Sequence, residues 1–112
     1  MRKTEHVPHE ADHFYRMAVH AQQKEHPEKV LAYFDRAIAA HPGHAMAWNE
    51  KANFLDSMGR CDDALSCYEM ALKLDPELSE AWFNKGLTLK KMGRESEGIA
   101  CINKGIDFAC GR

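Results

Sequence analysis

The sequence predicts an all-α protein, built as a solenoid of three stacked helical hairpins. The chain repeats itself at intervals of 34 residues, since Trp48 recurs as Trp82 and Cys67 recurs as Cys101. Such self-similarity at a fixed period indicates a repeat architecture. Within each unit, apolar and small residues recur at intervals of three and four residues, which is the spacing of an amphipathic α-helix.

The repeats form one domain over residues 11–112, because a chain of 112 residues is too short for two independent cores. Its three units are residues 11–44, 45–78 and 79–112. Residues 1–10 are expected to form an N-terminal extension and the start of the first helix.

Each unit is expected to contain two helices, over residues 9–24, 28–40, 45–58, 62–74, 79–92 and 96–108. Pro27 marks the boundary in the first unit, because proline cannot continue a helix but suits the first turn of the next one. Gly59 and Gly93 stand where the first helices of the later units end, and glycine can adopt the left-handed conformation that closes a helix. Asp75 precedes Pro76, and the residue before a proline disfavours the α-helical conformation. We therefore expect the helix over residues 62–74 to end here.

Equivalent positions of the three units carry residues of similar size. The fourth position is aromatic and the eighth is small, namely Phe14, Trp48 and Trp82, then Ala18, Ala52 and Gly86. The second helices show three aligned sets, which are Val30, Ala64 and Gly98, then Phe34, Tyr68 and Ile102, then Ala37, Ala71 and Gly105. Gly98 and Gly105 are expected to weaken the last helix, each by roughly 0.5–1 kcal/mol relative to alanine.

This pattern resembles the tetratricopeptide repeat family, and the resemblance covers residues 11–112. The middle unit matches best, through Trp48, Ala52, Leu55, Gly59, Ala64, Tyr68, Ala71 and Pro76. The resemblance implies a right-handed superhelix whose first helices line a concave groove for peptides or partner helices. It also implies a non-catalytic scaffold or adaptor, so we expect no enzyme activity and no cofactor.

The family's geometry places eight residues of the first helices on the groove, namely Tyr15, Val19, Met46, Asn49, Asn53, Phe83, Asn84 and Leu87. Phe83 and Leu87 are four residues apart and would form an exposed apolar strip, which is typical of partner sites. Asparagine amides can bond to a peptide backbone. The alternative is that packing within the chain hides part of this strip.

The carboxylate clamp with which some family members hold heat-shock proteins is not expected. The clamp's lysines, asparagines and arginine would fall at Tyr15, Val19, Glu50, Glu80 and Asn84. No cation stands at these positions and two of them are acidic. A protein or peptide partner of another kind is therefore expected.

The last helix suggests an alternative function as a homo-oligomerising module. It carries Ile99, Ile102, Ile106 and Phe108 with no following unit to cover them, whereas terminal repeats usually need a polar outer face. This face would dock a second chain, as a homodimer, or another protein.

All seven histidines lie within the first 44 residues. His9 and His13 are four residues apart, a spacing that can place two imidazoles on one metal ion, and His20 lies on the same helical face. Because this face begins the stack, the histidines favour a polar cap, and metal binding is a minor alternative.

Composition excludes several other classes of protein. With 15 Lys and Arg against 17 Asp and Glu, the net charge is 15 − 17 = −2, so a strongly basic nucleic-acid binder is excluded. The apolar runs fall far short of the roughly 20 residues that cross a bilayer, and no secretory signal is expected. The four cysteines lack a C-x-x-C pair, which favours reduced thiols and a cytoplasmic location.

Overall fold

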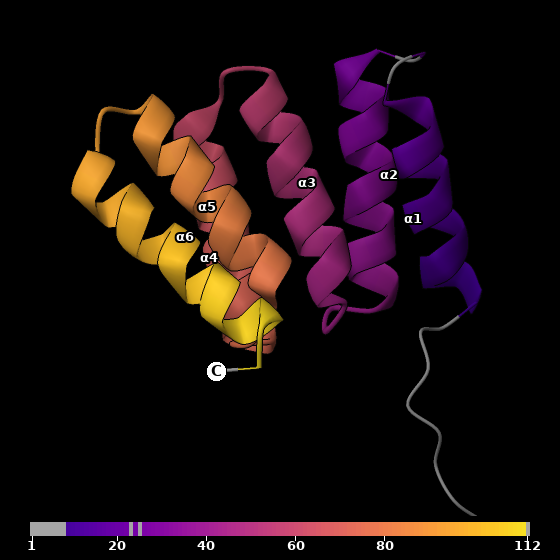
Figure 1. The fold of residues 1–112 in the computed structure, drawn as a ribbon. Coiled ribbons are helices and arrows are strands. Elements are labelled where there is room, and N and C mark those ends of the chain that lie inside the picture. The colour runs from indigo at the N-terminus through magenta and orange to yellow at the C-terminus, as the bar shows by residue number, and fades with distance from the viewer. Residues whose placement is uncertain (1–8, 23, 25, 112) are drawn as a thin grey trace, which may run out of the picture.

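The computed structural model describes residues 9–22, 24 and 26–111, and this part of the chain forms six α-helices. They are α1 (His9–Ala21), α2 (Pro27–Ala40), α3 (Ala45–Ser57), α4 (Cys61–Leu74), α5 (Ser79–Lys91) and α6 (Glu95–Ala109) (Figure 1). Each unit contributes one antiparallel hairpin, and the predicted all-α stack of three hairpins is confirmed. Most of the N-terminal extension, residues 1–8, lies outside the described residues.

The prolines and glycines that mark helix boundaries in the sequence lie at helix boundaries in the structure. α2 has Pro27 in its first turn, and Gly59 and Gly93 have φ angles of 79° and 83°. α4 ends immediately before Asp75. α1 ends at Ala21, before the predicted end at residue 24. Its end is hard to predict because no glycine or proline marks it before the proline that begins α2.

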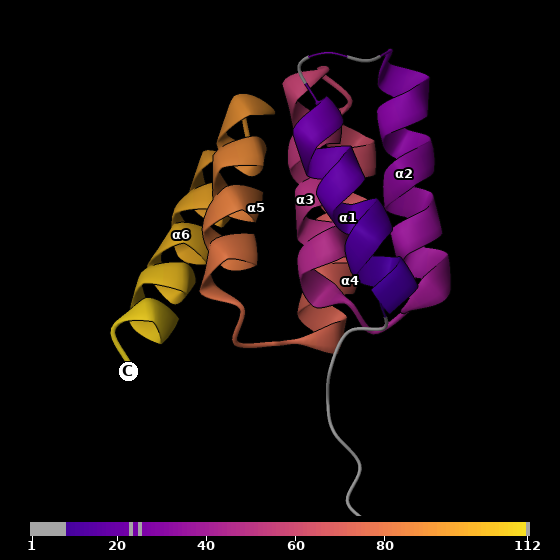
Figure 2. The same cartoon turned by 90° about the vertical axis from the view of Figure 1, so that its right-hand side faces the viewer.

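The hairpins follow one another along a flat body of 43 × 40 × 18 Å, from α1–α2 at one end to α5–α6 at the other (Figure 2). Within the stack, α3 packs against α2 and α5 packs against both α4 and α3. Each first helix after the opening one therefore sits on the hairpin before it.

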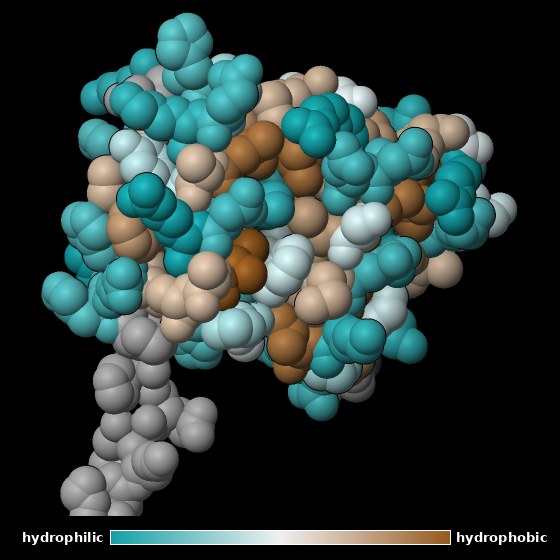
Figure 3. Space-filling view, turned by 180° about the vertical axis from the view of Figure 1, so that it is seen from behind, coloured by the Kyte–Doolittle hydropathy of each residue, from teal (hydrophilic) through white to brown (hydrophobic). Residues whose placement is uncertain are grey.

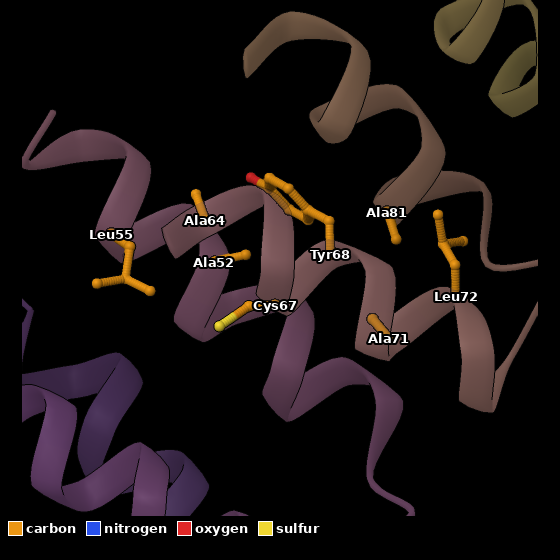
Figure 4. Packing of buried hydrophobic residues seen from close by; sticks show 8 residues of the cluster. All are labelled: Ala52, Leu55, Ala64, Cys67, Tyr68, Ala71, Leu72 and Ala81. Atoms are coloured by element: carbon orange, nitrogen blue, oxygen red, sulfur yellow. The ribbon is translucent and has the colours of Figure 1, made fainter. Parts of the chain in front are cut away.

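The central core lies at the junction between the second and third hairpins. Tyr68 is 1% exposed and packs with Ala52, Ala64, Ala71 and Ala81 (Figure 4). These small side chains let three helices approach the aromatic ring. The recurring alanines of the sequence are therefore contact positions between helices.

Glycines replace these alanines in the third hairpin, where α5 and α6 lie very close together. A Cβ atom on Gly86 would lie 2.5 Å from the carbonyl oxygen of Gly98, and one on Gly105 would lie 2.9 Å from the carbonyl oxygen of Ser79. The expectation that Gly98 and Gly105 only weaken the last helix was incomplete, because they allow α6, a helix of 15 residues, to pack against α5.

The surface is chemically mixed. On the face shown in Figure 3, hydrophobic residues form small patches separated by hydrophilic ones. Within the described residues, no helix is long and apolar enough to cross a membrane. The four cysteine thiols, at Cys61, Cys67, Cys101 and Cys110, are free.

Candidate functional site

The helices α1, α3 and α5 form a surface that we call the first-helix face. One row of equivalent positions on it consists of Val19, Asn53 and Leu87, which are 34 residues apart. Val19 is 43% exposed and Leu87 is 42% exposed. Asn53 is half-buried and accepts a hydrogen bond from the Tyr68 hydroxyl. One large exposed apolar side chain thus lies at each end of the row.

A second row consists of Tyr15, Asn49 and Phe83, and their exposures differ. The prediction that Asn49 faces a groove is wrong, because its side chain is 1% exposed. α5 covers it, and Asn84 Nδ2 donates to Asn49 Oδ1 at 3.5 Å. Tyr15 is half-buried, with its ring centroid 4.9 Å from that of His44. Phe83, on the last hairpin, is 42% exposed.

Met46 and Asn84, the remaining predicted groove residues, are half-buried on α3 and α5. The structure therefore keeps seven of the eight predicted residues at least partly accessible. Their role in binding stays a prediction.

Carboxylates gather around Tyr15. Burial, followed by the charges of Glu50, Glu80 and Asp12, raises the pKa of Tyr15 to about 12. Burial also raises the pKa of Glu50, and the charge of Glu80 adds to the rise while a side-chain hydrogen bond opposes it. Asp12 pairs with Arg16 at 3.0 Å. Among the described residues, Glu50 and Glu80 form no ion pair, so this end of the face favours a cation.

The predicted self-association face on α6 is narrower than the sequence indicates. Ile99 and Ile106 are 44% and 43% exposed. Ile102 and Phe108 are half-buried, and Ile102 packs over Gly86, where its Cγ1 would lie 2.6 Å from an added Cβ. Ile102 belongs to the hairpin core because it occupies the position of the buried aromatics in earlier units. Self-association itself stays a prediction.

A hollow of about 290 Å³ lies beside these isoleucines, between α5 and α6. Its lining consists of Ser79, Glu80, Phe83, Asn84, Gly105, Ile106 and Ala109. Sequence reasoning missed Ser79, Gly105 and Ala109 as candidates. The repeat offered a signal, since the third unit has Gly105 and Ala109 where the second has Ala71 and Asp75.

The candidate metal ligands His9, His13 and His20 are all exposed on α1. Within the described part of the chain, no three His, Cys, Asp or Glu side chains come together as a metal site. The remaining N-terminal histidine, His6, lies outside the described residues. Metal binding therefore stays a prediction.

His44 has a structural role that the sequence did not indicate. Its Nδ1 accepts a hydrogen bond from the backbone N–H of Ala47 at 3.4 Å and so caps α3. Burial lowers the pKa of His44; the neighbouring His41 lowers it further, while Asp12 acts in the opposite direction. The neutral form of His44 is therefore favoured in the fold.

Profiles of known families match most of the chain. A profile described as TPR repeat matches residues 56–93, and two described as tetratricopeptide repeat match residues 15–57 and 79–109. An uncharacterized protein of Methanocaldococcus jannaschii is 36% identical over 58 residues, which cover 52% of this chain and 67% of that protein.

Solved structures share the fold. The structure of MamA superposes with a TM-score of 0.82 at 23% identity, covering 88% of this chain and 58% of MamA. The second TPR of Spaghetti (RPAP3), bound to the HSP90 peptide SRMEEVD, has a TM-score of 0.81 at 17% identity and covers 88% of this chain and 91% of that one. At these identities the likeness concerns the fold alone, and this chain spans less than two thirds of MamA.

Proposed function

This chain belongs to the tetratricopeptide repeat family, and we propose that it is a non-catalytic adaptor whose first-helix face binds a peptide segment of a partner protein. The observation that carries the proposal is the exposure of Val19, Phe83 and Leu87, each above 40%, on α1 and α5. Phe83 and Leu87 are one helical turn apart on α5, and neighbouring exposed apolar side chains of this kind mark interaction sites. The peptide-bound RPAP3 repeat domain supports a peptide as the kind of ligand.

Binding a peptide here would bury apolar surface and satisfy polar groups together. Covering the exposed parts of Val19, Phe83 and Leu87 contributes about 25 cal/mol for each Å² removed from water. The amide of Asn84 is half-buried beside Phe83 and can bond to a peptide backbone. The apolar contacts supply affinity, and the amide orients the ligand.

The carboxylates near Tyr15 favour a ligand that carries a positive charge. Glu50 and Glu80 lack ion-pair partners within the described residues, and both act on Tyr15. A lysine or arginine of the ligand would pair with these carboxylates, of which Glu50 is half-buried and Glu80 is exposed. The acidic peptide SRMEEVD, which RPAP3 binds, would be repelled, so we propose a partner other than a heat-shock C-terminus. We also propose a cytoplasmic location, which the four free thiols support.

Selection from a random peptide library on the immobilised protein tests the proposal. The selected peptide is synthesised with a fluorescent label, and its affinity is measured by anisotropy. Val19→Glu should weaken binding about tenfold or more. Leu74→Glu is the matched control, since Leu74 is 40% exposed but lies on α4, and it should bind as the wild type does.

The selected sequences should be rich in lysine or arginine beside apolar residues, and Glu50→Gln should weaken their binding. Equal affinities for Val19→Glu and wild type would contradict the proposal. So would binding of SRMEEVD as tight as that of the selected peptide.

A further inference from the structure

The two inner junctions of the stack are built alike. In the first, the ring of His44, the residue before α3, lies 4.9 Å from that of Tyr15 on α1, and Ala47 of α3 is fully buried. In the second, Leu78 and Ala81 of α5 pack into the core cluster of α3 and α4. In each junction the first turn of the next hairpin packs on the preceding one. It does so through a larger side chain and, three residues later, an alanine.

The third hairpin carries the same junction, and none of the described residues is seated on it. Leu65 and Leu72 are each 8% exposed, whereas their equivalents Ile99 and Ile106 are 44% and 43% exposed. The position of buried Asn49 is likewise taken by exposed Phe83. The hollow of about 290 Å³ lies at this place. We call this surface the end socket, formed by Phe83, Ile99, Gly105, Ile106 and Ala109.

We propose that the end socket binds an amphipathic α-helix of a partner protein, which packs on α5 and α6 as α5 packs on α3 and α4. The inner junction fixes the direction of this helix. Near their starts, α5 and α3 meet through Asn84 and Asn49. Near their ends, Lys91 Nζ lies 2.9 Å from Asp56 Oδ2. α5 is therefore parallel to α3, and the partner helix runs parallel to α5.

The charges of the end socket fit a helix in this direction. Glu80 lines the hollow where the partner helix begins, and Lys90 lies in the last turn of α5, near where it ends. A helix is positive at its N-terminus and negative at its C-terminus, so both ends meet an opposite charge.

Lys90 also selects an acidic residue on the partner. It occupies the position of Asp56 in the second unit, 34 residues earlier. Asp56 accepts a hydrogen bond from Thr88 at 2.9 Å and pairs with Lys91. Lys90 stands in its place, and among the described residues it pairs with Glu95 at a long 3.8 Å. The favoured side chain at the Lys91 position of the incoming helix is therefore a carboxylate.

The start of a second copy of this chain is a poor occupant. Its α1 would bring His13 where α3 and α5 carry fully buried alanine, and His20 where α5 carries fully buried Thr88. The imidazole of His13 is too large for the position of the buried alanine. The imidazole of His20, at the position of Thr88, would lie toward Lys90. The partner helix therefore needs a small residue where His13 stands.

The test uses a peptide of residues 76–94, the helix that fills the inner junction, with Lys91→Glu to suit Lys90. A lactam between Phe83→Lys and Leu87→Asp, two positions that are exposed in the protein, holds the peptide helical, so that an ordering cost does not mask binding. Its affinity for the intact protein is measured by fluorescence anisotropy. The control peptide carries Ala81→Glu, which would place a charge in the hollow beside Glu80.

We expect saturable binding of the bridged peptide. Ile106→Glu should weaken this binding about tenfold or more, and Ala109→Trp should also weaken it by filling the hollow. Leu74→Glu and Val19→Glu should bind the peptide unchanged, which separates this surface from the first-helix face. The Ala81→Glu peptide should not bind, and the peptide with Lys91 retained should bind roughly threefold more weakly.

Circular dichroism establishes that the protein variants are folded. No saturable binding by the bridged peptide, or binding unaffected by both Ile106→Glu and Ala109→Trp, would overturn the proposal. Analytical ultracentrifugation adds a third check. A dimer of the protein alone that Ile106→Glu dissolves would also overturn it, because a second copy would then be the occupant.

Discussion

Replacing Gly86 by alanine tests whether α5 and α6 depend on glycine for their contact. A Cβ at this position would lie 2.5 Å from the Gly98 carbonyl oxygen and 2.6 Å from Ile102 Cγ1. Ordinary contacts of this kind begin near 3.4 Å, so the shortfall is 3.4 − 2.5 = 0.9 Å. One of the two close atoms is backbone, so the helices must separate and loosen the hairpin.

The expected cost follows from two opposing effects. Overpacking a tight contact costs about 1–3 kcal/mol, while alanine gains about 0.5–1 kcal/mol over glycine within a helix. Because one of the clashing atoms is backbone, the overpacking cost should lie in the upper part of its range, at about 2–3 kcal/mol. The net loss should therefore be about 1–2.5 kcal/mol. In a domain of this size that lowers the melting temperature by roughly 4–10 °C.

Urea unfolding followed by circular dichroism measures the effect. Gly43→Ala is the matched control, because an added Cβ there meets only the His41 ring at 3.5 and 3.6 Å and its φ is not positive. This control should be unchanged or slightly more stable. A Gly86→Ala protein as stable as the wild type would refute the reasoning.

Three further changes test other parts of the structure. The pKa of His44 is lowered in the fold, so the unfolded chain takes up the proton more readily, and stability is full above about pH 6.5 and falls as pH drops through the lowered pKa. His44→Ser should flatten this decline in urea midpoints measured from pH 8 to 5, and an unchanged slope would contradict the assignment. Thr88→Val removes the hydrogen bond to Asp56 and should cost about 1.5–3 kcal/mol in urea unfolding; an unchanged midpoint would show that this bond contributes little. Gly59→Ala forces a side chain onto a φ of 79° and should cost about 1–2 kcal/mol, whereas no loss by calorimetry would mean that the turn relaxes.

The helices were predictable because their signals are local. Pro27, Gly59 and Gly93 act on their own backbone, and the structure has helix boundaries beside each of them. The end of α1 carries no such signal, and the sequence predicts it at residue 24 where the structure has it at Ala21. The hairpins were predictable from the repeat, because equivalent residues form equivalent contacts.

Exposure on the first-helix face was harder to predict, because it depends on the neighbouring hairpin. Tyr15, Asn49 and Phe83 are equivalent in sequence, yet they are half-buried, buried and exposed. Asn49 is polar and still loses its accessible surface to α5. The order of hairpins in the stack decides burial here, and residue type alone does not reveal it.

The close packing of the third hairpin was also missed. The sequence indicated only that Gly98 and Gly105 are poor helix formers. Their value lies in contacts with Gly86 and Ser79 on another helix, which no propensity describes. Gly105 and Ser79 also line the hollow of the end socket.

Amide chemical-shift mapping with the library-selected peptide tests the central claim most directly, since it reports where the peptide lies. We predict that the largest shifts fall on α1, α3 and α5, around Val19, Asn53 and Leu87, and that α2 and α4 change little. Shifts concentrated on α2 and α4, or on α6 alone, would contradict the claim that the first-helix face is the binding surface.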